Sequence, residues 1–303
     1  MKRLSILMMV CIMAAVMMLP VSCQKENNAP NIPDSPIIPD PPIFPDGVLP
    51  GSFSVSATQQ VHFSQGNLQY QASTDTWRFA EHQYDYVGTQ TADDYGYYGG
   101  NVSGSDNRNI SSTYSGWIDL FGWGTGDNPT LSSDNDSAYG TFVDWGSNPI
   151  SNGGNTANRW RTLTQAEWEY LLNTRPGALS KKGTGNINGV GGLIILPDNW
   201  TLPPSGCTFI CGISSSYSDW TRNSYTLSQW AQMETAGAVF LPAAGDRYRT
   251  EVSVLGGHYW LSTPKNEIDA YCIFFYGNNL DATDHGHRSF GFSVRPVFGT
   301  INY

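Results

Sequence analysis

The chain has 303 residues and a formal net charge of −10, with 14% charged residues, 13% aromatic residues and 32 glycines. An acidic chain without a basic run is a poor partner for nucleic acid. The few charges and many aromatic and glycine residues favour a loop-rich fold over a helical one.

The N-terminus has the layout of an export signal. Two basic residues precede an apolar run over 4–19, which is too short to span a bilayer and is typical of a secretory signal. After Cys23 the sequence becomes polar, as QKENN. This layout resembles a bacterial lipoprotein signal, in which the cysteine becomes the acylated first residue, although Leu19 lies four residues before the cysteine rather than three.

We therefore expect residues 1–22 to be a signal peptide and Cys23 to carry lipid at the outer membrane or cell surface. Ordinary secretion without lipid is the alternative. Closely spaced prolines between 29 and 50 block helix and sheet pairing, so residues 23–50 are expected to form an extended tether. Residues 51–303 have the length of one domain, because mixed domains of about 250 residues are common.

The first part of this domain is expected to combine short strands with long loops. Two β-rich runs broken by the turn sequence SQGN predict a hairpin over 53–70, and an aromatic run predicts a strand over 77–87. Gly, Asn, Asp and Ser dominate 88–151. Ordered loops of this length need side-chain anchors, and the expected anchors are Trp117, Phe121, Trp123 and Trp145.

Two helices follow. Thr164 and Glu167 form a capping-box pattern that predicts a helix over 164–173, with Trp168, Leu171 and Leu172 on one face. A second helix is expected from Thr226 to Gly237, with Leu227, Trp230 and Met233 spaced by three. Short β-rich runs predict strands over 193–196, 238–241, 259–262, 270–276 and 291–297. Two helices among many short strands predict an α+β domain.

Four motifs resemble one family in their order along the chain: RTLTQAEWEYLL (161–172), LPAAGDRY (241–248), YWLSTP (259–264) and GFSVRPV (291–297). They are similar to landmarks of the formylglycine-generating (sulfatase-modifying) family, which shares its C-type-lectin-like fold with the variable proteins of diversity-generating retroelements. The segment 53–123 resembles surface lipoproteins of gut Bacteroidetes that carry this module. The resemblance implies a single C-type-lectin-like domain.

The resemblance does not extend to catalysis. Formylglycine generation uses a pair of redox cysteines near the C-terminus, whereas this chain has only Cys272 there. Because a lone thiol cannot do that chemistry, we expect neither an enzyme nor a cofactor. Cys207 and Cys211 are spaced to close a small disulfide in an oxidising compartment. A secreted hydrolase that uses carboxylates in the Gly/Asn-rich loops is a further alternative.

The resemblance to retroelement-diversified proteins implies a variable surface within 258–297. Such systems rewrite adenines, so asparagine codons change to many residue types but not to Lys, Glu, Gln, Met or Trp. None of these five types occurs between Asp269 and Phe290. The insert 272–290 also shows no helical or strand periodicity, as expected of an arbitrary displayed surface.

Within this segment Ile273, Phe275 and Leu280 are expected to be scaffold. In a strand, Cys272, Phe274 and Tyr276 then point to the opposite face, where exposed aromatic rings suit a binding surface. The alternative is a strand buried on both faces. The expected ligand-binding residues are Tyr259, Leu261, Cys272, Phe274, Tyr276, Asn279, Asp281, Thr283, Asp284, His285, Gly286, His287, Ser289 and Phe290.

The expected ligand is a protein or a glycan, and the expected contact with the membrane is the lipid alone. A carbohydrate-binding or adhesin-tip module without diversification is the main alternative. We expect no metal, although two polar clusters keep that question open. The first contains His285 and His287 with Asp281 and Asp284, and the second contains Asp127, Asp134, Asp136 and Asp144. Glu167 and Glu169 diverge on their helix, and Arg295 is expected to support the scaffold.

Overall fold

The computed structural model describes residues 44–88, 106–108, 110–202, 206–214, 219–254, 256–276 and 278–299. The expected signal peptide, Cys23 and most of the expected tether lie outside these residues. One compact unit extends from Ile43 to Tyr303, and Val48 and Leu49 are buried within it. The packed domain therefore begins before Gly51, where the end of the prolines would place its boundary. Within the described part of the chain, no helix is long and apolar enough to cross a membrane.

The domain is sheet-rich and contains few helices, as expected for an α+β chain. One sheet has the order β1-β2-β15-β5 and joins the two ends of the domain, because β15 near the C-terminus pairs with β2 through Val297 and Phe63. The strands of this sheet are β1 (Phe53–Ser54), β2 (Gln60–Phe63), β15 (Val297–Phe298) and β5 (Trp160–Arg161).

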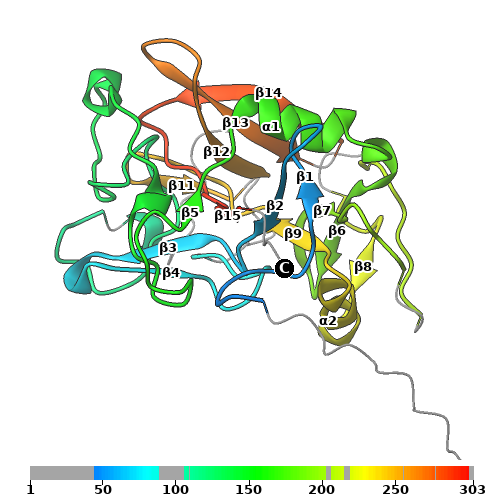
Figure 1. Cartoon of the computed structure of the whole chain (residues 1–303). Helices are drawn as coiled ribbons and strands as arrows, with labels where there is room; N and C mark the ends of the chain where they lie inside the picture. The colour runs from blue at the N-terminus through cyan, green and yellow to red at the C-terminus, as the bar shows by residue number, and fades with distance from the viewer. Residues whose placement is uncertain are drawn as a thin grey trace, which may run out of the picture. The chain divides into compact units, whose positions relative to one another are not determined.

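A second sheet has the order β8-β6-β7-β9 and lies next to helix α2 (Figure 1). Its strands are β8 (Ser224–Tyr225), β6 (Lys182–Ile187), β7 (Val190–Ile195) and β9 (Val239–Pro242). Strand β9 is buried along its whole length, which agrees with its apolar sequence VFLP. The expected strands at 193–196 and 238–241 are thus confirmed with small shifts of their ends.

The third sheet, β12-β13-β14, contains most of the expected binding residues. It is antiparallel and consists of β12 (Gly257–Pro264), β13 (Asp269–Tyr276) and β14 (Asn279–His287). Figure 1 shows α1 beside β14 at the top of the domain. Two hairpins complete the strands: β3 (Leu68–Gln71) with β4 (Thr76–Phe79), and β10 (Asp246–Tyr248) with β11 (Glu251–Ser253).

Helix α1 (Gln165–Glu169) begins as its sequence predicts. The Thr164 hydroxyl accepts from the Glu167 amide at 3.2 Å, and the Glu167 carboxylate accepts from the Thr164 amide at 2.8 Å. The helix continues as a π-helical turn, Tyr170–Thr174. Its apolar face is buried at Trp168, Leu171 and Leu172, so this prediction is confirmed.

Helix α2 (Leu227–Thr235) is also capped by a box, formed by Thr226 and Gln229. The chain leaves the helix through Gly237, whose φ of 94° is one that glycine adopts without steric cost. Trp230 and Met233 are buried as expected, but Leu227 is 46% exposed. The remaining short helices are η1 (Ala72–Thr74), η2 (Asp106–Arg108), η3 (Asp136–Tyr139), η4 (Trp145–Ser147) and η6 (Ala178–Ser180).

Buried tryptophans hold the long loops on the sheets. The indole of Trp123 donates to the Leu261 carbonyl at 2.8 Å, and the indole of Trp260 donates to the Phe121 carbonyl at 2.7 Å. These two bonds, which we call the indole clamps, join the loop around 121–123 to β12 from both sides. Phe121 and Trp145 are also fully buried, which confirms them with Trp123 as anchors of the loops, whereas Trp117 is half-buried and lies against the Arg78 guanidinium.

Three details of the expected strands are wrong. The first hairpin, β1 with β2, turns between 55 and 59, whereas the chain after SQGN leaves to pair β3 with β4. The strand expected over 77–87 ends at Phe79. The strand expected over 291–297 is reduced to isolated bridges at 291–293 and to β15. In the last two cases the partner segment is short, and a strand extends only as far as its partner.

Candidate ligand-binding surface

Strands β13 and β14 form a regular hairpin where the sequence shows no strand periodicity. The pairing runs from Asp269 opposite His287 to Tyr276 opposite Asn279, with one irregularity between Cys272 and Phe274. Strand β14 lies at the edge of its sheet and its side chains are mostly polar. Main-chain hydrogen bonds therefore define it, so the expectation of a patternless insert is wrong for 279–287, while β13 confirms the strand expected over 270–276.

Three of the expected binding residues are not on the surface. Tyr259 is 1% exposed, and Leu261 and Cys272 are fully buried. Strand β12 packs on both faces, because Tyr259 and Leu261 belong to one core cluster and Trp260 belongs to another with Cys272. Burial raises the pKa of the Cys272 thiol well above its usual range. For these residues the alternative of a strand buried on both faces is correct.

The other expected residues reach the surface to differing degrees. The exposed ones are Asn279, Thr283, His285 and His287. The half-buried ones are Phe274, Tyr276, Asp281, Asp284, Gly286, Ser289 and Phe290. The scaffold prediction is confirmed for Ile273 and Phe275, which are fully buried, and Leu280 packs partly buried against the same core cluster.

Gly286 differs from its neighbours because its backbone lies close to an aromatic ring. A Cβ added there would lie 2.7 Å from Cζ of Phe292. A larger residue at this position therefore requires the buried Phe292 ring to move. The expectation that residue 286 contributes a freely variable side chain to the surface is wrong.

The fold brings five rings from four segments next to one another, and we call this set of neighbouring rings the aromatic row. Its successive centroids lie 4.7 Å apart from Phe274 to His258, 4.7 Å from His258 to Phe292, 6.1 Å from Phe292 to Phe290, and 5.3 Å from Phe290 to Tyr248. Phe274 and Phe290 are half-buried and offer ring surface to a ligand. Aromatic rings give large contact area at low entropic cost.

Sequence reasoning missed the three ring partners His258, Phe292 and Tyr248. Each lies in or next to a motif that was assigned to the scaffold: GFSVRPV contains Phe292, LPAAGDRY ends at Tyr248, and His258 directly precedes YWLSTP. Aromatic residues inside or next to the scaffold motifs are the signal that would have identified them.

The charge on this surface is set by burial. Burial lowers the pKa of His258 to about 4, against the opposing effect of the Gly245 backbone. The imidazole in the aromatic row is therefore neutral at pH 7 and stacks between Phe274 and Phe292 as an uncharged ring. Asp246 lies two residues before Tyr248, and burial raises the pKa of its carboxyl group to about 7.

A loop from the middle of the chain is bonded to the end of β14. Nδ1 of His287 lies 3.2 Å from the Asp136 carboxylate, and the Ser289 amide donates to the same carboxylate at 3.1 Å. Burial alone would raise the pKa of Asp136, but these hydrogen bonds outweigh it and hold the pKa below its usual range. Asp134 pairs with Arg249 at 2.6 Å. The loop, the turn after β10 and the end of β14 thus lie side by side.

Neither of the two polar clusters assembles as a metal site in the part of the chain that the structure describes. No group of three or more His, Cys, Asp or Glu side chains is placed there to hold an ion. Asp144 instead caps η4 and accepts a hydrogen bond from Thr162. Asp136 contacts His287 and accepts from the Ser289 amide. Nδ1 of His285 lies 3.9 Å from the Asp284 carboxylate.

The remaining candidates have structural partners. Glu167 pairs with Arg161 at 2.6 Å and completes the helix cap. Arg295 is buried and donates to Asn67 at 3.3 Å and to Gln83 at 3.0 Å, which confirms its scaffold role. Cys207 and Cys211 are free, the first buried and the second exposed, so the disulfide that their spacing allows is not formed in this structure.

No protein-family model, curated protein or solved structure matches this chain.

Proposed function

We propose that this chain is a surface-displayed lipoprotein that binds a ligand through a C-type-lectin-like domain and has no catalytic activity. The observation that carries the proposal is the aromatic row. Half-buried Phe274 and Phe290 belong to one group of neighbouring rings, and grouped apolar surface rimmed by polar residues marks interaction sites. Rings of this kind, surrounded by polar side chains, are typical of binding surfaces.

The fold assignment is supported by the order of the four motifs along the chain. The first lies on β5 and α1, the second runs from β9 to β10, the third lies on β12, and the fourth leads into β15. These segments converge, because β15 pairs with β5 and the core cluster that includes Trp168 also includes Tyr259 and Leu261. A C-type-lectin-like domain of the formylglycine-generating type accounts for this order.

Diversification by a retroelement is part of the proposal. The exposed residues of β14 alternate with less exposed ones at Asn279, Thr283, His285 and His287. The hairpin also lacks all five residue types that adenine rewriting cannot produce from asparagine codons. A reverse transcriptase gene next to this one, with a near-copy of the DNA for 258–297 that differs only at adenines, would support it. A neighbourhood without either would favour the non-diversified module.

The proposed partner is a protein or a glycan, the proposed membrane contact is lipid on Cys23, and no cofactor or nucleic acid is involved. A carbohydrate-binding module is the second candidate, because half-buried aromatic rings also stack on sugar rings. Protein and glycan arrays probed with the purified chain test both. Binding to neither array, together with hydrolysis of an arrayed glycan, would replace the proposal with the hydrolase alternative.

A further inference from the structure

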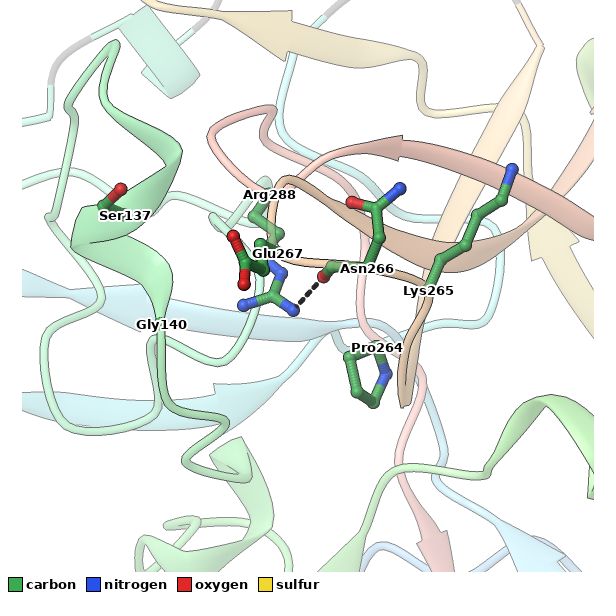
Figure 2. A pocket seen from close by; sticks show the side chains of 7 residues that line it. All are labelled: Ser137, Gly140, Pro264, Lys265, Asn266, Glu267 and Arg288. Carbon is green, nitrogen blue, oxygen red and sulfur yellow. Dashed lines mark hydrogen bonds between the residues drawn. The ribbon is translucent and has the colours of Figure 1, made fainter.

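A polar hollow lies beside the surface described above and shares no residue with the aromatic row. It has a volume of about 510 Å³ and opens between η3 and the turn from β12 to β13. Figure 2 shows Ser137 on one side, Lys265 and Asn266 on the other, and Arg288 and Glu267 between them. Its volume is in the range of small-molecule sites, about 300 to 1,000 Å³.

Arg288 is the buried charge of this hollow, because its residue is only 6% exposed. Its guanidinium donates to the backbone carbonyls of Tyr139 at 3.2 Å, Asp269 at 3.5 Å and Asn266. It also lies over the Trp123 ring, 4.4 Å from the centroid. All of these partners are neutral. They position the guanidinium and leave about two of its five N–H donors for another acceptor.

No carboxylate of the described residues forms an ion pair with Arg288. Glu267 lines the same hollow but makes no such pair, and in Figure 2 the Lys265 ammonium points away from the guanidinium. Three carbonyls and the Trp123 ring compensate the buried charge of Arg288, and the N–H donors that remain can bind an anion that enters the hollow.

The charges around the hollow select the kind of anion. A planar guanidinium binds a planar carboxylate through two parallel hydrogen bonds. A phosphate or sulfate would bring more negative charge close to Glu267, with only one cation directed at it. Glu267 accepts hydrogen bonds, and the exposed Ser137 hydroxyl both donates and accepts them, so both suit a ligand that carries hydroxyl groups.

We infer that this hollow is a second binding site, for a hydroxylated monocarboxylate such as a uronic acid, held by Arg288 through its carboxylate and by Glu267 and Ser137 through its hydroxyls. The inference goes beyond the proposed function, because it does not depend on what the aromatic row binds.

Calorimetric titration of the purified protein with glucuronate, glucose and glucose 6-phosphate tests the ligand class. Glucuronate should bind, and glucose should bind about tenfold more weakly, because it lacks the charge-assisted pair with Arg288. Glucose 6-phosphate should also bind more weakly than glucuronate. Glu267→Gln should strengthen the binding of glucose 6-phosphate, because it removes the repulsion between the carboxylate and the phosphate. Equal affinities for glucuronate and glucose, or no binding of glucuronate, would overturn the inference.

Variants locate the site. Arg288→Lys should weaken the binding of glucuronate at least about tenfold, since lysine cannot form the bidentate pair. Arg288 also supports two loops, so this substitution can affect the fold as well. Ser137→Trp avoids that problem, because Ser137 is exposed and the indole would fill the hollow. Ser132→Trp, in the same loop but outside the hollow, is the matched control.

Ser137→Trp should abolish glucuronate binding and Ser132→Trp should preserve it, both with an unchanged melting temperature. Unchanged binding by Ser137→Trp would show that glucuronate does not enter the hollow. Phe274→Ser separates the two sites, because it should leave glucuronate binding intact. Loss of glucuronate binding in Phe274→Ser would assign the sugar acid to the aromatic row and refute the second site.

Discussion

Asp136 and His287 are 151 residues apart in the chain, yet their side chains lie 3.2 Å apart. The same carboxylate accepts from the Ser289 amide. The loop that contains Asp136 is therefore part of the surface formed by β14. Any ligand that covers the exposed side chains of β14 will also meet this loop.

Replacing Asp136 by Ala should destabilise the protein by about 1 kcal/mol at pH 7, the usual net value of a hydrogen bond. Because the pKa of Asp136 is held below its usual range, its ionised form stabilises the folded state above the unfolded pKa of about 4. That contribution disappears as the pH falls through the lower folded pKa. The difference in melting temperature between wild type and variant should therefore shrink as the pH falls below about 4. A difference that grows as the pH falls below about 4 would contradict this account.

Replacing Phe274 and Phe290 together by Ser should abolish ligand binding, because aromatic anchors dominate interface energy. Stability should fall by more at Phe290, which packs against the core cluster that contains Phe292, than at Phe274, whose ring contacts His258. The matched control is Ile273→Ser with Phe275→Ser. Both of these residues are fully buried, so the control should unfold the domain by opening cavities and burying hydroxyl groups. Array binding measures the loss of ligand, and thermal melting measures the change in stability. If the first variant unfolds while the control stays folded, the face that contains Phe274 is the core and the assignment of the two faces is wrong.

Trp168→Ala should destabilise the domain by about 3 to 5 kcal/mol, the usual cost of truncating a buried aromatic side chain. Trp168 is 2% exposed and packs 5.5 Å from the ring of Phe63. The substitution thus removes contacts between α1 and the first sheet. Denaturant titration gives the value. Leu179→Ala, at a residue that is 71% exposed, is the control and should cost less than about 0.5 kcal/mol.

The cysteines should differ in their reactivity towards iodoacetamide in the native protein. Cys211 is exposed and should be alkylated, whereas Cys207 and Cys272 are buried and should react only after denaturation. The raised pKa of Cys272 further lowers its thiolate fraction. Peptide mass spectrometry reads each site. Rapid labelling of Cys272 in the native protein would show that Cys272 is exposed on the binding surface. Absence of labelling at Cys211 would indicate a disulfide formed on export.

Cys23→Ser should move the protein from the membrane fraction to the soluble fraction, because the thiol of Cys23 is the proposed lipid acceptor. Fractionation with mass spectrometry of the mature N-terminus measures this. Cys211→Ser is the control and should leave the protein in the membrane fraction. Wild-type protein that is already soluble and carries no lipid would favour ordinary secretion.

The features that the sequence predicts well are those determined by neighbouring residues. Thr164 and Glu167 define a helix start because a capping box is a local hydrogen-bond pattern, and Ile273 and Phe275 are identified as core by their spacing. Strand β14 was missed because its pairing depends on main-chain atoms of β13 and its polar sequence carries no hydrophobic period.

The sequence also does not predict which residues are buried by segments that lie far away in the chain. Cys272 alternates correctly with Ile273, but its face is covered by Trp260 and Phe292, which come from other segments. Likewise the partners Asp136 and His287, and the stacking of His258 between Phe274 and Phe292, depend on how distant loops meet. No local pattern records these contacts.

The indole clamps have a practical consequence for protein engineering. Trp123 and Trp260 each donate to a main-chain carbonyl, so neither clamp depends on which side chains β14 carries. Strand pairing between β13 and β14 uses main-chain atoms as well. A combinatorial library that randomises Asn279, Thr283, His285 and His287, with Gly286 kept, should therefore retain folded members at high frequency. Selection from such a library would make the domain a framework for new affinity reagents.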